Sequence, residues 1–83
     1  MSMMTLPIKC FGVFRKFGES LNVDIAVGSS VLEVKQALIQ KLGQDQKVLV
    51  EESVLANDNE ILPNVYILKE ETTLSILPPV CGG

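Results

Sequence analysis

The sequence contains no histidine and no tryptophan, and it has only two cysteines, Cys10 and Cys81. A tetrahedral zinc site draws most of its ligands from cysteine and histidine, so the chain lacks the ligands for one. A serine–histidine–aspartate triad cannot be built without histidine. These absences exclude most familiar side-chain active sites, and we predict no metal site.

Basic residues are also scarce, because 7 lysines and arginines stand against 10 acids and the net charge is −3. Nucleic-acid binding normally needs a basic patch, so a polyanion partner is not expected. The charge is uneven along the chain. Residues 1–47 hold six bases and four acids, whereas residues 48–83 hold one base and six acids. The C-terminal half therefore suits a basic groove on a partner protein.

Long apolar runs are missing, since no stretch approaches the roughly 18 residues that a membrane helix needs. Residues 1–9 lack the basic and then apolar order of a signal peptide. We therefore expect a soluble cytoplasmic protein with reduced thiols. A chain of 83 residues fits one compact domain with little interior for a cofactor. We expect no cofactor bound by this chain, and we expect any chemistry at an edge or an end.

Alternation of apolar and polar residues predicts two strands near the N-terminus. Residues 8–14 are typical of a strand, and residues 15–20 are typical of a charged turn. In residues 21–27 apolar side chains alternate with polar or small ones, which is the period of a half-buried strand. The two segments are predicted to form an antiparallel hairpin.

A helix is predicted after this hairpin. Ser30 and Glu33 have the spacing of a capping box, in which each side chain bonds to the backbone N–H of the other residue. Gly43 lies where a left-handed C-cap is favoured. An apolar stripe between these signals predicts that the helix covers one face of the sheet. The stripe consists of Val31, Val34, Leu38 and Leu42, with Ala37 beside it.

The second half of the chain carries shorter signals. Two apolar runs, 48–50 and 54–56, precede a predicted turn at 57–59, and the strand order is left open there. A proline within residues 61–68 predicts an irregular connection. Residues 74–77 are predicted to form the last strand.

The sequence of elements indicates an α+β fold. Strand, strand, helix and then two or three more strands are typical of a roll with one main helix packed on one face of a mixed sheet. By analogy at the level of the fold, this is the β-grasp, or ubiquitin-like, arrangement. We expect residues 1–77 to form the β-grasp domain and residues 78–83 to form a flexible C-terminal tail.

The tail is the most informative segment. Pro78 and Pro79 cannot donate to a strand ladder, so the chain must leave the sheet there. Gly82 and Gly83 make a narrow tip without side chains, although such an end is also compatible with ordinary fraying. A terminal carboxylate on this tip can enter a partner's channel and reach an electrophilic phosphorus. Adenylation, and then replacement of AMP by sulfur, would leave a thiocarboxylate.

Residues 77–83, Leu-Pro-Pro-Val-Cys-Gly-Gly, resemble the tail F-P-P-V-x-G-G of the molybdopterin synthase small subunit, the MoaD family. Residues 11–17 resemble the F-A-x-x-R-E-L segment of that family, and residues 55–57 resemble its V-A-V-N strand and turn. The chain is therefore similar to a ubiquitin-like sulfur carrier over nearly its whole length.

This resemblance implies that the terminal carboxylate of Gly83 carries the chemistry. An E1-like adenylyltransferase would use ATP to activate Gly83, which would then become a thiocarboxylate. With Gly82 and Cys81 giving access, the tail would enter the large synthase subunit and donate sulfur to cyclic pyranopterin monophosphate in molybdenum cofactor biosynthesis. Family members work as heterotetramers of small and large subunits. The chain would thus belong to a sulfurtransferase complex without a side-chain active site of its own.

Residues around the exit of the tail are predicted to contact the partner. For Phe11, ordinary core packing is equally compatible with the sequence. Cys10, in a predicted strand, is interpreted as an inert core residue. Cys81 either forms an acyl disulfide with a neighbouring thiocarboxylate or is simply tolerated as a small side chain. The predicted partner-binding residues are Phe11, Ile76, Leu77, Pro78, Pro79 and Val80.

Other interpretations remain open. The chain could be a thiamine-type sulfur carrier, or a ubiquitin-like protein modifier that forms isopeptide bonds through the same terminus. The proline pair at 78–79 favours the molybdopterin role, because thiamine-type carriers resemble this tail at Gly-Gly but usually lack the pair. The chain could also be a plain β-grasp docking module whose tail has no role.

Overall fold

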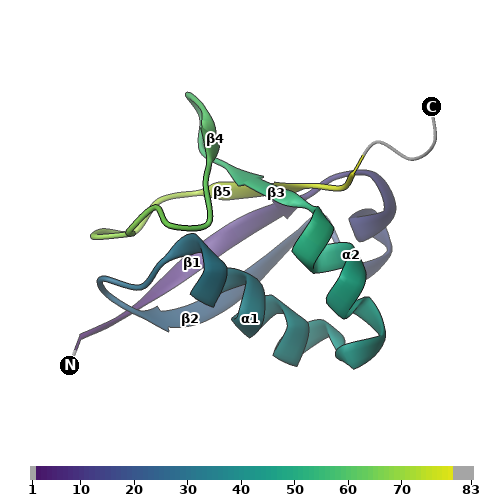
Figure 1. Ribbon diagram of the computed structural model, residues 1–83, viewed down its shortest axis with the longest axis horizontal. Coiled ribbons are helices and arrows are strands. Elements are labelled where there is room, and N and C mark those ends of the chain that lie inside the picture. Colours follow the sequence, from purple (N-terminus) through teal and green to yellow (C-terminus); the bar gives the residue numbers. More distant parts are fainter. Residues whose placement is uncertain (1, 80–83) are drawn as a thin grey trace.

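The computed structural model describes residues 2–79 and shows a five-stranded mixed sheet with α1 lying across one face (Figure 1). The strand order is β2-β1-β5-β3-β4, and the neighbours β1 and β5 are parallel. This arrangement confirms the predicted α+β roll with one main helix. The elements are β1 Met3–Cys10, η1 Gly12–Phe17, β2 Ser20–Ala26, α1 Val31–Leu42, η2 Gln44–Gln46, α2 Lys47–Glu52, β3 Val54–Ala56, β4 Ile61–Leu62 and β5 Leu74–Leu77.

The first strand lies closer to the N-terminus than the predicted segment 8–14, so that prediction was wrong at both ends. β1 pairs antiparallel with β2 along nearly its whole length, which confirms the predicted hairpin. Beyond β1, the backbone turns into the 3-10 helix η1 because Gly12 adopts φ +58° and ends the extended conformation. The turn carries Phe14 into the core, where its side chain is fully buried.

The capping box of α1 is confirmed. The hydroxyl Oγ of Ser30 accepts from the backbone N–H of Glu33 at 3.3 Å, and Oε1 of Glu33 accepts from the backbone N–H of Ser30 at 3.0 Å. At the other end Gly43, with φ +109°, donates its N–H to Ile39 O at 2.7 Å. The helix therefore begins and ends where the local sequence signals predict.

Two buried side chains of α1, Lys35 and Ile39, lie outside the predicted apolar stripe. Lys35 lies on α1 with 5% of its surface exposed. Burial lowers the pKa of Lys35, and the negative charge of Glu51 on α2 partly opposes this shift. The buried side of α1 thus contains a lysine side chain as well as Val31, Val34 and Leu38 of the predicted apolar stripe.

The segment after α1 resolves the strand order that the sequence left open. Residues 48–50 belong to the short helix α2, whereas residues 54–56 form β3. The predicted turn at 57–59 is confirmed, because Oδ1 of Asn57 accepts two backbone N–H groups at 2.8 Å. Residues 61–68 are irregular as predicted, apart from β4 and an isolated bridge between Ser30 and Ile67.

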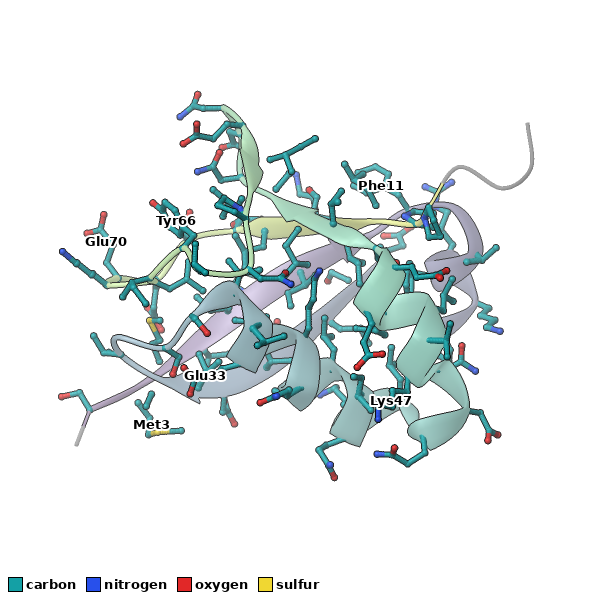
Figure 2. All side chains as sticks on the ribbon, viewed as in Figure 1. Met3, Phe11, Glu33, Lys47, Tyr66 and Glu70 are labelled. Atoms are coloured by element: carbon teal, nitrogen blue, oxygen red, sulfur yellow. The ribbon has the colours of Figure 1, made fainter. Side chains whose placement is uncertain are left out.

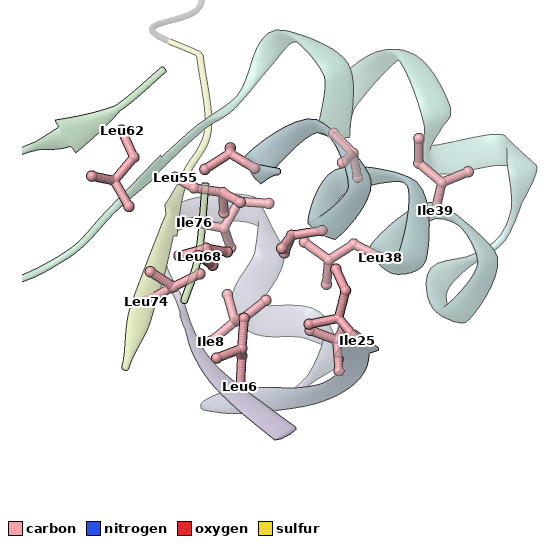
Figure 3. Packing of buried hydrophobic residues seen from close by; sticks show 14 of the residues in the cluster. Leu6, Ile8, Ile25, Leu38, Ile39, Leu55, Leu62, Leu68, Leu74 and Ile76 are labelled. Carbon is pink, nitrogen blue, oxygen red and sulfur yellow. The ribbon is translucent and has the colours of Figure 1, made fainter. Parts of the chain in front are cut away.

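The core lies between α1 and the inner face of the sheet (Figure 3). Alternate residues of β1 and β5 supply much of it, since successive strand residues point to opposite faces. No helix within residues 2–79 is long and apolar enough to span a membrane. The largest fully buried apolar side chains are Phe14, Leu6, Ile8, Leu38, Leu55, Leu74 and Ile76.

Candidate functional site

The described chain leaves the sheet at the C-terminal end of β5. This strand lies between β1 and β3, and its last residue, Leu77, pairs with Val54. Pro78 and Pro79 follow, and both are half-buried. Because neither proline has a backbone N–H, the ladder cannot continue in the usual way. The predicted departure of the chain at Pro78 is confirmed.

Gly12 contacts the first proline of this exit. A Cβ built on Gly12 would lie 2.7 Å from Cγ of Pro78, closer than real Cβ atoms approach a neighbour. The backbone of Gly12 is also in the left-handed region, which favours glycine. Gly12 therefore leaves room for the Pro78 ring beside η1 and holds the start of the tail against the folded domain.

The outer face of the sheet is apolar next to the exit. Val54 and Leu77 are ladder partners that point outward, because the adjacent Leu55 and Ile76 are fully buried on the inner face. Ile61 of β4 extends this outer face and is 60% exposed. We define the exit surface as Phe11, Val54, Leu77, Pro78 and Pro79.

The structure separates the predicted partner-binding residues into two groups. Phe11 is 41% exposed and lies beside the exit (Figure 2), while Leu77, Pro78 and Pro79 are half-buried there. Ile76 is fully buried, so its prediction as a partner contact was wrong. The strand alternation that turns Leu77 outward turns Ile76 into the core.

The chemical end of the predicted site lies outside the described residues. This applies to Gly83 as the reacting group, to Gly82 and Cys81 as access residues, and to Val80 as a partner contact. Their roles stay predictions. The structure describes the exit of the chain from the sheet up to Pro79.

Cys10 is a core residue, as predicted. Its side chain is 3% exposed, and its thiol lies 3.8 Å from the carbonyl oxygen of Ile8. Burial raises the pKa of the Cys10 thiol, because desolvation disfavours the thiolate. The thiol therefore has neither the access nor the ionisation that a nucleophile needs.

Side chains of the described part of the chain do not assemble a metal centre. Within residues 2–79, no three His, Cys, Asp or Glu side chains gather as a potential ligand set. The exit instead combines an apolar surface with a close contact between Gly12 and Pro78. Such an arrangement suits contact with another protein better than side-chain catalysis.

The model of the ThiS family matches residues 8–83 of the chain. The chain belongs to the ThiS family. Its members are ubiquitin-like sulfur carriers with a β-grasp fold, so the predicted fold class is confirmed. The match includes the tail segment together with the exit.

The fold of this chain is also similar to that of a solved structure. The crystal structure of SAMP1 from Haloferax volcanii matches with a TM-score of 0.71 and 18% sequence identity. The match covers 96% of this chain and 100% of that chain. Curated protein sequences give no match. At this identity the structural likeness establishes the shared fold.

Some residues of the site were missed by the sequence analysis. Val54 was expected only as part of a short apolar run, and Ile61 as part of an irregular connection. Their place on the exit side of the sheet depends on the pairing of β3 with β4 and β5, which no local pattern encodes. Gly12 offered a partial signal, because it lies inside the predicted strand segment 8–14, and a glycine within a strand often marks a site where another part of the chain approaches closely.

Proposed function

We propose that this ThiS-family protein is the sulfur-carrier subunit of a molybdopterin synthase and acts in the cytoplasm. In this role the carboxylate of Gly83 is the working group. An E1-like adenylyltransferase activates it with ATP, and a sulfur donor then converts it to a thiocarboxylate. The large synthase subunit receives the tail and transfers its sulfur to cyclic pyranopterin monophosphate. The chain itself binds no cofactor.

The observation that best supports the proposal is the construction of the exit. The chain departs through Pro78 and Pro79, and the Pro78 ring is seated against Gly12. A proline pair is stiff and extended, which suits a spacer between a folded domain and a reactive terminus. This combination suits delivery of a terminal group into the active site of a partner.

The distribution of apolar surface also supports a partner at the exit. Beside the tail, Val54 and Leu77 form an apolar outer face. Further along the same face, on β1 and β2, the Thr5 hydroxyl donates to Oδ1 of Asp24 at 2.6 Å, so this part is polar. An apolar centre bordered by polar residues is typical of a protein interface.

The chemistry follows from the nature of a carboxylate. A free carboxylate is a poor acyl donor, so an oxygen of Gly83 first attacks the α-phosphate of ATP and releases pyrophosphate. Hydrosulfide from the sulfur donor then attacks the carbonyl carbon of the acyl adenylate, and AMP leaves with the electron pair of the broken C–O bond. The product is a thiocarboxylate, which carries one sulfur in place of one oxygen. Glycine suits this chemistry, because no side chain obstructs the carbonyl.

A thiamine-type sulfur carrier is the second candidate. The match to the ThiS family model over residues 8–83 is compatible with this role as well, because both roles share activation at the same terminus. A ubiquitin-like modifier would share the activation as well but would end in an isopeptide bond to a lysine. The proline pair at the exit is the feature that favours the molybdopterin role.

The first experiment tests sulfur carriage. The full chain is incubated with ATP, an E1-like adenylyltransferase and a sulfur donor, and its intact mass is measured. We expect one oxygen to be replaced by one sulfur at Gly83, located by fragmentation of the C-terminal peptide. An unchanged mass in a reaction that converts a known carrier would favour the plain docking module.

The second experiment separates the candidates. The thiocarboxylated chain is given to a molybdopterin synthase large subunit with cyclic pyranopterin monophosphate, and in parallel to a thiazole synthase with its substrates. Formation of the dithiolene product only in the first reaction supports our proposal. Product only in the second reaction, or isopeptide-linked chains in either, contradicts it.

A further inference from the structure

A second apolar surface lies away from the exit, and sulfur carriage does not use it. Figure 2 shows Tyr66 and Glu70 at one end of the molecule and Phe11 towards the other. Val65, near Tyr66, is 79% exposed, the largest exposed fraction among the large hydrophobic residues of the described chain. We define the distal surface as Leu32, Val65, Tyr66 and Ile67, which are 43%, 79%, 39% and 45% exposed.

Backbone hydrogen bonds hold the distal surface together. The N–H of Val31 donates to Tyr66 O at 2.9 Å, and the N–H of Leu32 donates to Asn64 O at 3.1 Å. The loop 63–67 is thereby fastened to the first turn of α1. A surface whose backbone is already fixed loses little conformational freedom when a partner binds.

A groove beside this loop offers room for an apolar side chain. Its lining includes Leu62 and Leu68, which are only 3% and 2% exposed, and also Tyr66 and Ile67 of the distal surface. Lys69 and Glu70 belong to the same lining, so the groove itself carries one base and one acid. Its acidic border comes from Asp58 and Glu71, which are chain neighbours of the lining residues Asn57 and Thr72.

The charge around this surface is one-sided. Residues 57–73 contain four acids and one base, a net charge of −3, which equals the net charge of the whole chain. All five charged side chains are exposed. They are Asp58, Glu60, Glu70 and Glu71, against Lys69.

We propose that the distal surface docks a segment of another protein in which apolar side chains are flanked by lysine or arginine. A second copy of this chain is disfavoured, because two acidic segments would face each other. Nucleic acids and anionic membranes are disfavoured for the same reason. In a basic protein segment, the apolar side chains fit the groove and the lysine or arginine side chains pair with the surrounding acids.

This docking does not depend on the proposed sulfur chemistry, and it adds a second role for the domain. The distal surface and the exit surface share no residue, and Tyr66 and Phe11 lie towards different ends of the molecule (Figure 2), so one partner can contact either surface without contacting the other. A protein docked at the distal surface can therefore hold the carrier while the tail engages an enzyme.

The binding test uses the full chain and three synthetic peptides. The probe is Lys-Lys-Leu-Ile-Leu-Lys-Lys, and the two controls replace either every Lys by Glu or the apolar centre by Ser. Amide chemical shifts of the isotope-labelled chain are followed during titration. We expect changes centred on residues 62–70 with the probe, and at least about tenfold weaker binding of each control.

Several results would overturn the proposal. They are no change at residues 62–70, equal binding of the Glu-flanked peptide, or changes confined to the exit surface. Shifts of residues 62–70 that depend on protein concentration without peptide would assign the surface to a second copy instead.

Matched variants locate the contact. Val65→Ser should weaken binding of the probe about fivefold, because one exposed valine loses its apolar contact. Val48→Ser on α2, where the valine is 64% exposed, should bind the probe as the native chain does. Both variants should unfold at the native urea concentration. Native affinity in the Val65→Ser chain would contradict the proposal.

Discussion

At the scale of single residues, the contact between Gly12 and Pro78 connects the folded domain to its tail. Gly12 ends β1 by adopting φ +58°, and the same residue leaves space for the Pro78 ring. Two constraints thus meet at one position, one on the backbone and one on the space where a Cβ would be. Among the glycines of residues 2–79, Gly18, Gly28 and Gly43 carry only the first constraint.

Substitution of Gly12 should separate these constraints. Gly12→Ala, Gly28→Ala and Gly43→Ala should each lower the free energy of unfolding by about 1 kcal/mol or more, because all three glycines have positive φ. Only Gly12→Ala should displace Pro78, since nothing lies within 4 Å of a Cβ at Gly28 or Gly43. The ring-carbon chemical shifts of Pro78 report the displacement. Equal shifts in all three variants would contradict the account.

The thiol of Cys10 should be protected by the fold. Burial blocks access and raises its pKa, so the thiolate population at neutral pH is smaller than that of a free cysteine. In a Cys81→Ser chain, alkylation by iodoacetamide at neutral pH should be at least about a hundredfold slower in buffer than in denaturant. Comparable rates in the two conditions would show that the thiol is accessible.

At the scale of elements, α1 is specified by local signals. The capping box of Ser30 and Glu33 fixes its start, and Gly43 fixes its end. These signals operate within one helical turn, so they can be read directly from the sequence.

The capping box should contribute measurably to stability. Ser30→Ala removes the acceptor for the Glu33 N–H and should lower the free energy of unfolding by about 1 kcal/mol. Ser20→Ala, at an exposed position of β2, serves as the control and should change it by less than about 0.5 kcal/mol. Urea unfolding measures both. A loss no larger for Ser30→Ala than for the control would argue against the cap.

Lys35 should make the stability of the domain pH-dependent. Burial lowers its pKa in the folded state, so above that pKa the unfolded chain binds more protons than the folded one. Stability contributed by this group therefore rises with pH through the window between the lowered pKa and the ordinary lysine pKa of 10.5. Lys35→Met should flatten this rise, and Lys47→Met, at an exposed position of α2, should retain it. A rise unchanged in Lys35→Met would contradict the assignment.

The elements also show why sequence reasoning succeeded only in part. β5 was predicted at its observed bounds, because Leu74 to Leu77 alternate clearly. β1 was misplaced, since Pro7 obscures a strand whose start depends on pairing with β2. The inward direction of Ile76 follows from its position in the ladder with β1 and β3. Features that depend on pairing between strands distant in the sequence were therefore not predicted. The position of Val54 on the exit surface is one of them.

At the scale of the whole molecule, the domain presents distinct surfaces away from its core. Phe11 and the proline pair mark the exit, and the acidic segment 57–73 borders the distal surface. A small carrier has no room for a catalytic cavity in its own core, so its function depends on surfaces and a terminus. In the proposed function, the reactive group is therefore at the chain end and recognition takes place on the domain.

The most direct test of this account is the intact mass of two chains after the activation reaction. One is the native chain, and the other carries a single phenylalanine added after Gly83. Each is incubated with ATP, an E1-like adenylyltransferase and a sulfur donor, with precautions against proteolysis. We predict that the native chain exchanges one terminal oxygen for sulfur and that the extended chain remains unchanged. Equal sulfur incorporation into both intact chains, or sulfur located on a side chain, would contradict the central claim.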